Sequence, residues 1–497
     1  MVRVRKEKVV SAREMARIEK KSFEDGQSPE RYMNKAGKGI AERVQISIEE
    51  HENKRQVSLL VGKGNNGGDA FAAGICLLEL GYEVNAFHLF AFEESSQLCQ
   101  EKYRHFREEG GEVYHPKSLD ELAFYQKGVI LDGLLGTGFD GSTSGFLAEV
   151  IEFVNAQDIP VLSIDIPSGV NGNTGEVKGE AIIANETLYL GLPKIGLFVG
   201  DGYAYSGELH PIDFGMPPNY IDDASALCYT FQTEAAKQLM PVPHPQQHKY
   251  NAGYVVTLSG SQGMSGAAFL STFASLRSGA GIVHLFYNES MRSELGGKPW
   301  EVIAEPFNAA RVEKELQRAG ALVVGPGLSL SHEVTEILTK TTVPTVVDAS
   351  AIKYIPSIIN ACKQDLLLTP HRGELSFLID LHGASDMELV ERCQAYVDET
   401  GAYLLVKGAP TFFFERGEEP IVLPVGNPGM ATAGTGDVLS GILGALIAQG
   451  LLAKEAGPVG AYLHGLAGDI VAAEKGELSL IAGDLIDALP SVFSMHS

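Results

Sequence analysis

Two segments rich in glycine and aspartate carry the residue types needed to bind an anionic ligand. Residues 62–69 read GKGNNGGD, and residues 427–437 read NPGMATAGTGD. Each segment follows a strand-like apolar run and precedes a helix-like run, so bare backbone N–H groups would meet the positive end of a helix dipole. Because the two segments are not copies of each other, they predict two different active sites in one chain.

Further polar residues in the N-terminal half follow two other predicted strands, in the sequences LDGLLGTG and SIDIPSG. In an open parallel sheet, ligands bind outside the carboxyl ends of the strands. Asn66, Asp132, Asp165 and Ser168 could therefore converge there, and their oxygen atoms are ligands that a hard cation prefers. Taken alone, the glycine segment also fits a tight turn, and either aspartate fits a turn or capping residue.

The second segment leads directly into a helix expected from Val438. Backbone N–H groups at residues 434–437 could hold a phosphoryl group, and Asp437 could accept a proton from an attacking hydroxyl group. An ordinary helix-capping aspartate is the alternative. Likewise, His371 fits a ligand contact or a capping or core histidine, and Lys407 fits a phosphate contact or a surface lysine.

The elements between these segments predict an α/β fold. Short apolar runs alternate with helical stretches, which is typical of parallel sheets covered by helices. Proline-rich sequence near residues 215–250 indicates a boundary near residue 225, giving domains of residues 1–225 and 226–497. The expected strands are 57–61, 84–90, 129–131, 161–164, 254–258, 282–285, 321–324, 345–347, 365–368 and 403–406, and the expected helices are 11–50, 70–80, 146–155, 265–279 and 438–449.

Composition narrows the partners. The 497 residues carry a net charge of −24, which disfavours nucleic acid or an anionic membrane as the main partner. Five scattered cysteines with no CxxC pair predict reduced thiols, and the N-terminus lacks the apolar core of a signal peptide. We expect a cytoplasmic protein, in which the weakly polar run 438–453 forms a buried helix.

The N-terminal segments resemble the NAD(P)H-hydrate epimerase family, the N-terminal domain of the YjeF proteins, over roughly residues 10–220. The resemblance implies a potassium ion held by Asn66, Asp132 and Ser168, with Asp165 as the acid/base and Lys194 assisting. Asn171 stands where relatives often have aspartate. The implied substrate contacts are Asn65, Asn66, Gly67, Gly68, Asp69, Gly136, Thr137, Gly138, Phe139, Asp140, Gly141, Ser142 and Asp165.

The sequence GTGD before a helix resembles the ribokinase-like superfamily. An ordered set of further motifs (QHKYNAG, LSGS, GMSGAA, GPGL, Asp348-Ala349, LTPHRGE and LVKGA) resembles the ADP/ATP-dependent NAD(P)H-hydrate dehydratases over about residues 228–497. Ala433 replaces a common glycine. The resemblance implies catalysis by Asp437. It implies nucleotide contacts at Lys407, Gly408, Ala409, Pro410, Thr411, Asn427, Gly434, Thr435 and Gly436, and hydrate contacts at Ala267, Gly327, His371 and Asp437.

Together the resemblances imply a Rossmann-like three-layer α/β/α domain followed by a ribokinase-like α/β/α domain. They imply a bifunctional enzyme that epimerises NADHX and NADPHX and dehydrates the S form with ADP or ATP and magnesium, and that forms a homo-oligomer. The sequence leaves the choice between ADP and ATP open. Two alternatives also stay open: a kinase for a small alcohol, and a non-catalytic scaffold role for the N-terminal domain.

Overall fold

The computed structural model describes residues 2–329 and 332–496. The chain groups into two compact units. The N-terminal unit comprises Lys8–Cys228, and the C-terminal unit combines the segment that ends at Glu7 with the chain from Tyr229 onward. The chain passes between the two units twice, after Glu7 and after Cys228, and the expected boundary after residue 225 lies close to the second of these points. The sequence did not indicate that the first residues belong to the C-terminal unit.

The N-terminal unit contains a sheet in the order β4-β3-β2-β5-β6-β7-β8, in which every neighbouring pair is parallel. The chain leaves β2 toward one edge and β5 toward the other, so the switch point where ligands bind in such sheets lies between these two strands. The strands are β2 (Gln56–Val61), β3 (Glu83–His88), β4 (Glu112–Tyr114), β5 (Val129–Gly133), β6 (Val161–Ile164), β7 (Glu186–Leu190) and β8 (Glu208–Ile212).

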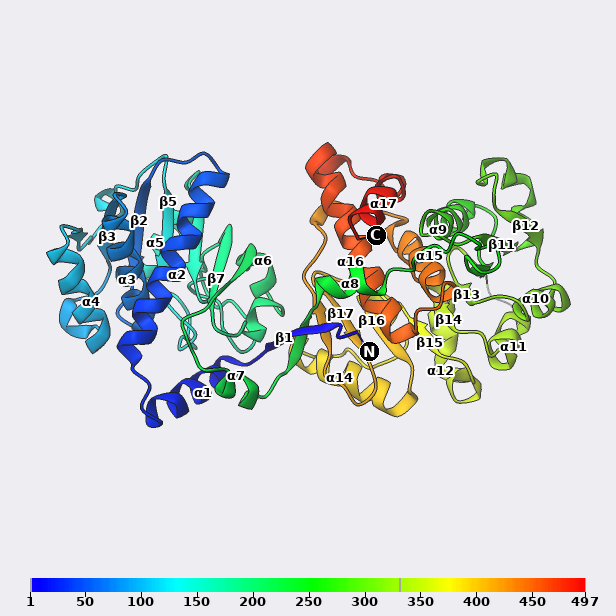
Figure 1. Cartoon of the computed structure of the whole chain (residues 1–497), viewed down its shortest axis with the longest axis horizontal. Helices are drawn as coiled ribbons and strands as arrows, with labels where there is room; N and C mark the ends of the chain where they lie inside the picture. Colours follow the sequence, from blue (N-terminus) through cyan, green and yellow to red (C-terminus); the bar gives the residue numbers. More distant parts are fainter. Residues whose placement is uncertain (1, 330–331, 497) are drawn as a thin grey trace. The chain divides into compact units, whose positions relative to one another are not determined.

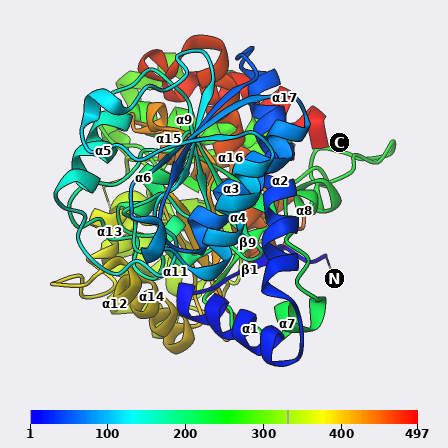
Figure 2. The same ribbon diagram turned by 90° about the vertical axis from the view of Figure 1, so that its left-hand side faces the viewer.

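Helices cover both faces of this sheet. Successive side chains of β2 enter two different hydrophobic clusters, Leu59 on one face and Leu60 on the other, as alternation along a strand requires. Figure 2 shows α2, α3 and α4 on one flank of the unit and α5 on the opposite flank. The helices are α1 (Ala12–Glu24), α2 (Pro29–Glu50), α3 (Asn65–Glu79), α4 (Gln97–Glu108), α5 (Phe146–Asn155), α6 (Gly202–Ser206) and α7 (Pro218–Asp223).

The C-terminal unit is built on the sheet β1-β9-β18-β17-β16-β15-β14-β13-β10-β11-β12. The strands from β12 to β16 are parallel, with their switch point between β10 and β13, whereas β17 is antiparallel to both of its neighbours. The strands are β1 (Arg5–Val9), β9 (Cys228–Phe231), β10 (Tyr254–Leu258), β11 (Ile282–Tyr287), β12 (Ile303–Pro306), β13 (Ala321–Val324), β14 (Thr345–Val347), β15 (Leu366–Leu368), β16 (Tyr403–Val406), β17 (Thr411–Phe414) and β18 (Ile421–Leu423).

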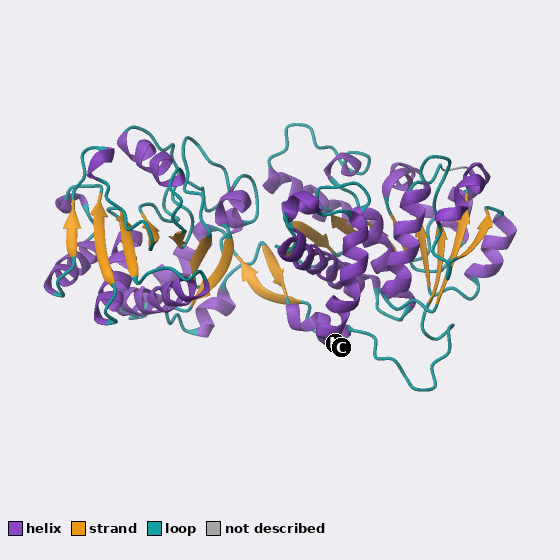
Figure 3. Cartoon of the chain, turned by 90° about the horizontal axis from the view of Figure 1, so that it is seen from above, coloured by secondary structure: helices purple, strands orange, loops and turns teal. Residues whose placement is uncertain are grey.

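Helices also pack on both faces of this second sheet, and Figure 3 shows strands between helices in each unit. The weakly polar run 438–453 was predicted as one buried helix. Its first part lies in α15 and is buried, but α15 ends at Ala448 and a new helix, α16, begins at Ala453. No helix of the described residues is long and apolar enough to span a membrane. The helices are α8 (Thr233–Leu239), α9 (Ser265–Arg277), α10 (Ala309–Leu316), α11 (His332–Lys340), α12 (Ile355–Ile358), α13 (Arg372–Leu375), α14 (Asp386–Thr400), α15 (Thr435–Ala448), α16 (Ala453–Lys475) and α17 (Ala482–His496).

The expected α/β architecture is confirmed, and Figure 1 shows the order of its elements. Two helix starts were placed too late. α3 begins at Asn65 and not at residue 70, and α15 begins at Thr435 and not at residue 438. In both cases glycine lies in the first turn, and its low helix propensity hid the helix from sequence reasoning.

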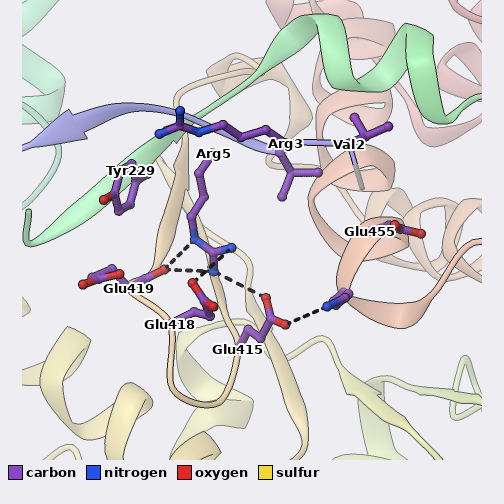
Figure 4. Close-up of a pocket in the computed structure, with 10 residues that line it drawn as sticks. Val2, Arg3, Arg5, Tyr229, Glu415, Glu418, Glu419 and Glu455 are labelled. Carbon is purple, nitrogen blue, oxygen red and sulfur yellow. Dashed lines mark hydrogen bonds and ion pairs between the residues drawn. The ribbon is translucent and has the colours of Figure 1, made fainter.

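The segment before Glu7 is fixed to the rest of the C-terminal unit by Arg5. Its guanidinium donates to the Glu419 carbonyl oxygen (3.2 Å) and to Glu415 (3.4 Å), which also pairs with Lys454. These residues line a surface pocket of about 410 Å³ (Figure 4). The pocket contains none of the predicted site residues, and ion pairs of Arg5 and Lys454 with Glu415 connect its walls.

We expect Gly62→Ala to destabilise the N-terminal unit, because a Cβ at Gly62 would lie 1.7 Å from the Leu134 carbonyl oxygen. Overpacking of this kind costs roughly 1–3 kcal/mol. The matched control is Gly138→Ala, where a Cβ would meet no atom within 4 Å. Urea unfolding, followed by circular dichroism, should show that the N-terminal unit of Gly62→Ala unfolds at a lower urea concentration than that of the wild type. The same transition should be unchanged in Gly138→Ala. Equal midpoints for the two variants would contradict this close packing.

Candidate active sites

The N-terminal candidate site lies at the switch point between β2 and β5. Residues 62–64 turn the chain from β2 into α3. The turn is tight, because a Cβ at Gly67 would lie 2.1 Å from the Gly62 carbonyl oxygen. No side chain caps the start of α3, so the N–H groups of its first turn are able to bind an anion.

The carboxylate of Asp132 joins the ends of β5 and β6 and is fully buried. Its Oδ1 accepts hydrogen bonds from Ser168 Oγ (2.6 Å) and the Leu134 N–H (3.2 Å), and its Oδ2 accepts from Ser163 Oγ (2.8 Å) and the Ser168 N–H (3.0 Å). Burial raises the pKa of Asp132, and these donors only partly oppose the shift. The main influences on this pKa include no basic side chain.

Asn66 and Ser168 meet Asp132 around the backbone of Leu135. Asn66 Nδ2 donates to the Leu135 carbonyl oxygen (2.8 Å), and the Leu135 N–H donates to Ser168 Oγ (2.8 Å). The structure thus brings the three residues of the expected potassium site together. Their donor set is all oxygen, and its buried negative charge has no basic group among its main influences, so these residues fit a hard cation.

Asp165 follows β6 in a left-handed backbone conformation with φ of 66°, which is uncommon for a residue other than glycine. Its carboxylate pairs with the ammonium of Lys194 and accepts a hydrogen bond from the Leu190 N–H (3.0 Å). Lys194 also donates to the Leu190 carbonyl oxygen (2.8 Å), and its side chain is 1% exposed. This clamp holds Asp165 rigidly at the carboxyl end of the sheet.

Two more carboxyl groups interact with this ion pair. Burial, followed by repulsion from Asp165, raises the pKa of Asp69 on α3 well above its usual range. Burial raises the pKa of Glu19 on α1 to about 7, although Lys194 opposes the shift. Sequence reasoning named Asp69 but missed Glu19, because α1 carries no motif and only tertiary packing brings it here. With a pKa of about 7, Glu19 can exchange protons near neutral pH.

The predicted substrate segment of residues 136–142 packs over Asn66, since a Cβ at Gly136 would lie 3.2 Å from the Asn66 Cβ. Asp140 Oδ1 accepts a hydrogen bond from Asn171 Nδ2 (2.8 Å). An ionised aspartate at position 171 could not donate this bond and would repel Asp140. The asparagine found here therefore ties the segment to the loop after β6.

The C-terminal candidate site lies where α15 begins. Gly434 is the N-cap residue and has φ of 96°, a conformation that favours glycine. Asp437 lies in the first turn and does not cap the helix, contrary to the capping alternative. Burial, followed by repulsion from Asp348, raises the pKa of Asp437 to about 7, while Lys407 opposes the shift. A carboxyl group with this pKa suits proton transfer near neutral pH.

A partly buried ion pair lies beside this turn. Lys407 Nζ is 2.7 Å from Asp348 Oδ1 and 3.8 Å from Glu374 Oε2. A Cβ at Gly436 would lie 3.1 Å from Lys407 Nζ, so the ammonium group packs against the first turn of α15. Lys407 was predicted as a nucleotide contact, whereas Asp348 and Glu374 were not among the predicted site residues.

His371 caps the start of α13, which is the alternative to a ligand contact that the sequence left open for this residue. Its Nδ1 accepts hydrogen bonds from the Gly373 N–H (2.9 Å) and the Glu374 N–H (3.3 Å). Its Nε2 lies 3.5 Å from Glu374 Oε1, and its side chain is 59% exposed. Because the Lys407 N–H donates to the Pro370 carbonyl oxygen (2.9 Å), the exposed histidine side chain stands beside the lysine segment.

The predicted nucleotide segment 427–436 is held by hydrogen bonds to side chains of α16. Asp469 accepts hydrogen bonds from Asn427 Nδ2 (2.9 Å) and the Gly426 N–H (3.1 Å). Burial lowers the pKa of His464 to about 4, so its neutral ring donates Nε2–H to the Thr435 carbonyl oxygen (2.9 Å). Neither α16 residue was predicted, because both act through contacts distant in sequence.

Ala267 and Gly327 come together at the second switch point, between β10 and β13. A Cβ at Gly327 would lie 3.1 Å from the Ala267 Cβ, and Ser261 Oγ donates to the Gly327 carbonyl oxygen (2.8 Å). A Cβ at Gly434 would lie 2.5 Å from the Leu270 side chain on α9, the helix that also carries Ala267. The expected hydrate contacts and the start of α15 therefore share one helix as a neighbour.

Comparison with known proteins assigns each unit to a family. The profile described as "YjeF-related protein N-terminus" matches residues 29–196, and the profile of NAD(P)H-hydrate dehydratase matches residues 255–491. Among solved structures, a ribokinase-like superfamily protein from Enterococcus faecalis is 26% identical (TM-score 0.49, 54% of this chain and 95% of that one). An ADP/ATP-dependent NAD(P)H-hydrate dehydratase from Bacillus subtilis, co-crystallised with ATP/Mg2+, is 24% identical (TM-score 0.47, 54% and 99%).

Whole-length relatives carry both units. The bifunctional NAD(P)H-hydrate repair enzyme Nnr of Moorella thermoacetica is 32% identical over 97% of this chain and 96% of its own length. The enzymes of the same description from Coxiella burnetii and Thermofilum pendens are each 31% identical over 96% of this chain, covering 97% and 95% of their own lengths. The chain therefore belongs to the family of bifunctional NAD(P)H-hydrate repair enzymes.

Proposed function

We propose that this chain restores hydrated nicotinamide cofactors by two reactions at two separate sites. The N-terminal unit interconverts the R and S forms of NADHX and NADPHX, and the C-terminal unit dehydrates the S form to NADH or NADPH. The observation that carries the proposal is the presence of two distinct switch-point sites, each with an uncapped helix start and a buried carboxyl group, in a chain that matches bifunctional relatives along its whole length. An epimerase in the same chain as a stereospecific dehydratase makes both epimers usable.

At the C-terminal site, the Asp437 carboxylate takes the proton of the C6 hydroxyl group while that oxygen attacks the terminal phosphorus of the nucleotide. The bond between this phosphorus and its bridging oxygen breaks, so with ADP as the donor the leaving group is AMP. Phosphate then leaves C6 as a proton is lost from C5, which forms the ring double bond. The N–H groups at the start of α15 and Lys407 stabilise the charge on the phosphoryl oxygens.

Lys407, Gly408, Ala409, Pro410 and Thr411 are proposed to hold the nucleotide together with Asn427, Gly434, Thr435 and Gly436. Ala267, Gly327 and His371 would face the hydrate. When bound with the nucleotide, magnesium would neutralise part of its phosphate charge. ADP is our proposed donor and ATP the second candidate.

At the N-terminal site, the substrate would lie along residues 65–69 and 136–142. Asp165, held by Lys194, is the proposed acid/base for departure and return of the C6 hydroxyl group, and burial raises the pKa of the neighbouring carboxyl groups of Asp69 and Glu19. Potassium at Asn66, Asp132 and Ser168 would supply a fixed positive charge that offsets the buried carboxylate. Self-association of the chain stays a prediction.

Absorbance at the NADH band tests the whole proposal. With a mixture of R and S NADHX, magnesium and potassium, we expect complete recovery of NADH with ADP, and a parallel reaction with ATP names the donor. Recovery limited to the S fraction would contradict epimerisation and favour the scaffold role. A stable phosphorylated product from a small alcohol, without NADH recovery, would contradict dehydration and favour the kinase alternative.

Single substitutions should separate the two reactions. Asp437→Asn removes the proton acceptor, so we expect dehydration to fall by about 10²–10⁴-fold while epimerisation stays unchanged. Asp165→Asn should slow epimerisation by a similar factor, so that only the S fraction returns rapidly to NADH. Each variant is the matched control of the other, with thermal unfolding as a check of folding. An Asp437→Asn enzyme with full dehydration would remove the assignment of the base.

The dehydration rate should depend on pH through Asp437. Its pKa is raised to about 7, and only the unprotonated carboxylate accepts a proton, so kcat/KM should fall as pH drops through about 7. Initial rates between pH 5 and 9 with S-NADHX at low concentration measure this limb. A profile that stays flat down to pH 5 would contradict the raised pKa.

A further inference from the structure

The buried carboxylate of Asp348 is a centre of contacts directly beneath the C-terminal site. It follows β14 and is 2% exposed. Its Oδ1 accepts hydrogen bonds from Lys407 Nζ (2.7 Å) and Thr369 Oγ1 (2.9 Å), and its Oδ2 accepts one from Ser440 Oγ (2.6 Å). Three elements are thus joined at one side chain: the end of β15, the end of β16 and the second turn of α15.

The contact with Lys407 fixes the ammonium group where it would meet an anionic ligand. Lys407 Nζ packs against the first turn of α15 at Gly436. Burial would lower the pKa of Lys407, but Asp348 and Glu374 reverse this and keep the lysine charged. Burial likewise favours the protonated form of Asp348, yet Lys407 and the two hydroxyl groups lower its pKa overall. Both partners are therefore ionised at neutral pH.

The same charges act on Asp437. The groups that influence it are Asp348 at the end of β14, Lys407 at the end of β16 and Glu374 on α13. His464 on α16 is neutral near pH 7 and contributes no charge. After burial, Asp348 has the largest effect, and it favours the protonated form of Asp437.

We propose that Asp348 is a positioning residue for the dehydratase reaction, which holds the Lys407 ammonium against the start of α15 and places a negative charge beside the turn that carries Asp437. This inference rests on the proposed dehydratase activity. Thr369 and Ser440 donate hydrogen bonds that keep the carboxylate oriented toward Lys407, so the ammonium group is held in one position. Asp348 itself does not touch the substrate in this role.

Three variants test the proposal by the pH profile of dehydration and by the KM for nucleotide. Asp348→Asn keeps the shape but removes the charge, so its acid limb should move to lower pH by roughly one unit, as expected for one charge at effective dielectric constant of about 20. Its KM for nucleotide should rise about tenfold, because the ammonium group is no longer oriented. Lys407→Met removes the opposite charge, so its limb should move to higher pH.

Ser440→Ala is the matched control, since it removes one hydrogen bond of Asp348 and keeps both charges, and its acid limb should stay at the wild-type position. Opposite shifts in Asp348→Asn and Lys407→Met would support the proposal, because a purely structural role predicts loss of rate without opposite shifts. If Asp348→Asn fails to fold by circular dichroism, the direction of the Lys407→Met limb decides.

An unmoved limb in a folded Asp348→Asn enzyme, or a Lys407→Met limb that moves to lower pH, would overturn the inference. Both outcomes differ from failure of the proposed function. If the proposed function fails, the wild-type enzyme will return no NADH from S-NADHX with either nucleotide. The pH profile of the wild-type enzyme is the reference for every shift above, so the two failures are distinguishable.

Discussion

The close approach of two strand ends at the switch point of a parallel sheet is the constraint on which each site depends. In the N-terminal unit, the turn after β2 lies so near Leu134 that Gly62 has no space for a Cβ. In the C-terminal unit, the Gly260 N–H donates to the Pro326 carbonyl oxygen (2.9 Å), with Gly260 at φ of 82°. At a switch point, the connections that follow the two neighbouring strands run toward opposite edges of the sheet. This leaves a crevice outside the carboxyl ends of these strands, where a ligand can bind. Glycine is therefore required by backbone packing as much as by the ligand.

A buried carboxylate stands at a strand end in both units, and each is compensated differently. Asp132 receives four hydrogen bonds from hydroxyl and N–H groups and has no basic side chain among its main influences. Asp348 also accepts hydrogen bonds from hydroxyl groups, but its negative charge is neutralised by the ammonium group of Lys407. Isolated charges are costly in a protein interior. The first arrangement therefore suits a bound cation, whereas the second already contains its positive charge and uses it for positioning.

Sequence patterns predicted the parts of the structure that are determined locally. Apolar runs located most central strands, and the glycine segments located both sites, because tight turns and helix starts need particular residues within a few positions. Glycine in the first turns of α3 and α15 obscured where those helices begin. Glu19, His464 and Asp469 were not predicted as site residues, since each reaches its site through packing of elements distant in the chain, and no local spacing marks such contacts. Asp348 belonged to a motif that carried the resemblance but was given no role in the site.

Burial of titratable carboxyl groups gives these sites their chemistry at a cost in stability. Asp437 has a pKa of about 7 against an ordinary 3.8, so between these values the folded chain binds more protons than the unfolded chain. Its contribution to stability therefore falls as pH rises through this range, by up to about 4 kcal/mol. The ion pair of Asp348 and Lys407 works in the opposite direction, because its carboxylate is stabilised in the folded state at neutral pH. Asp348 is fully paired with Lys407, whereas the neighbouring carboxyl group of Asp437 is partly repelled by Asp348. The same cluster therefore stabilises the fold and provides a base for proton transfer.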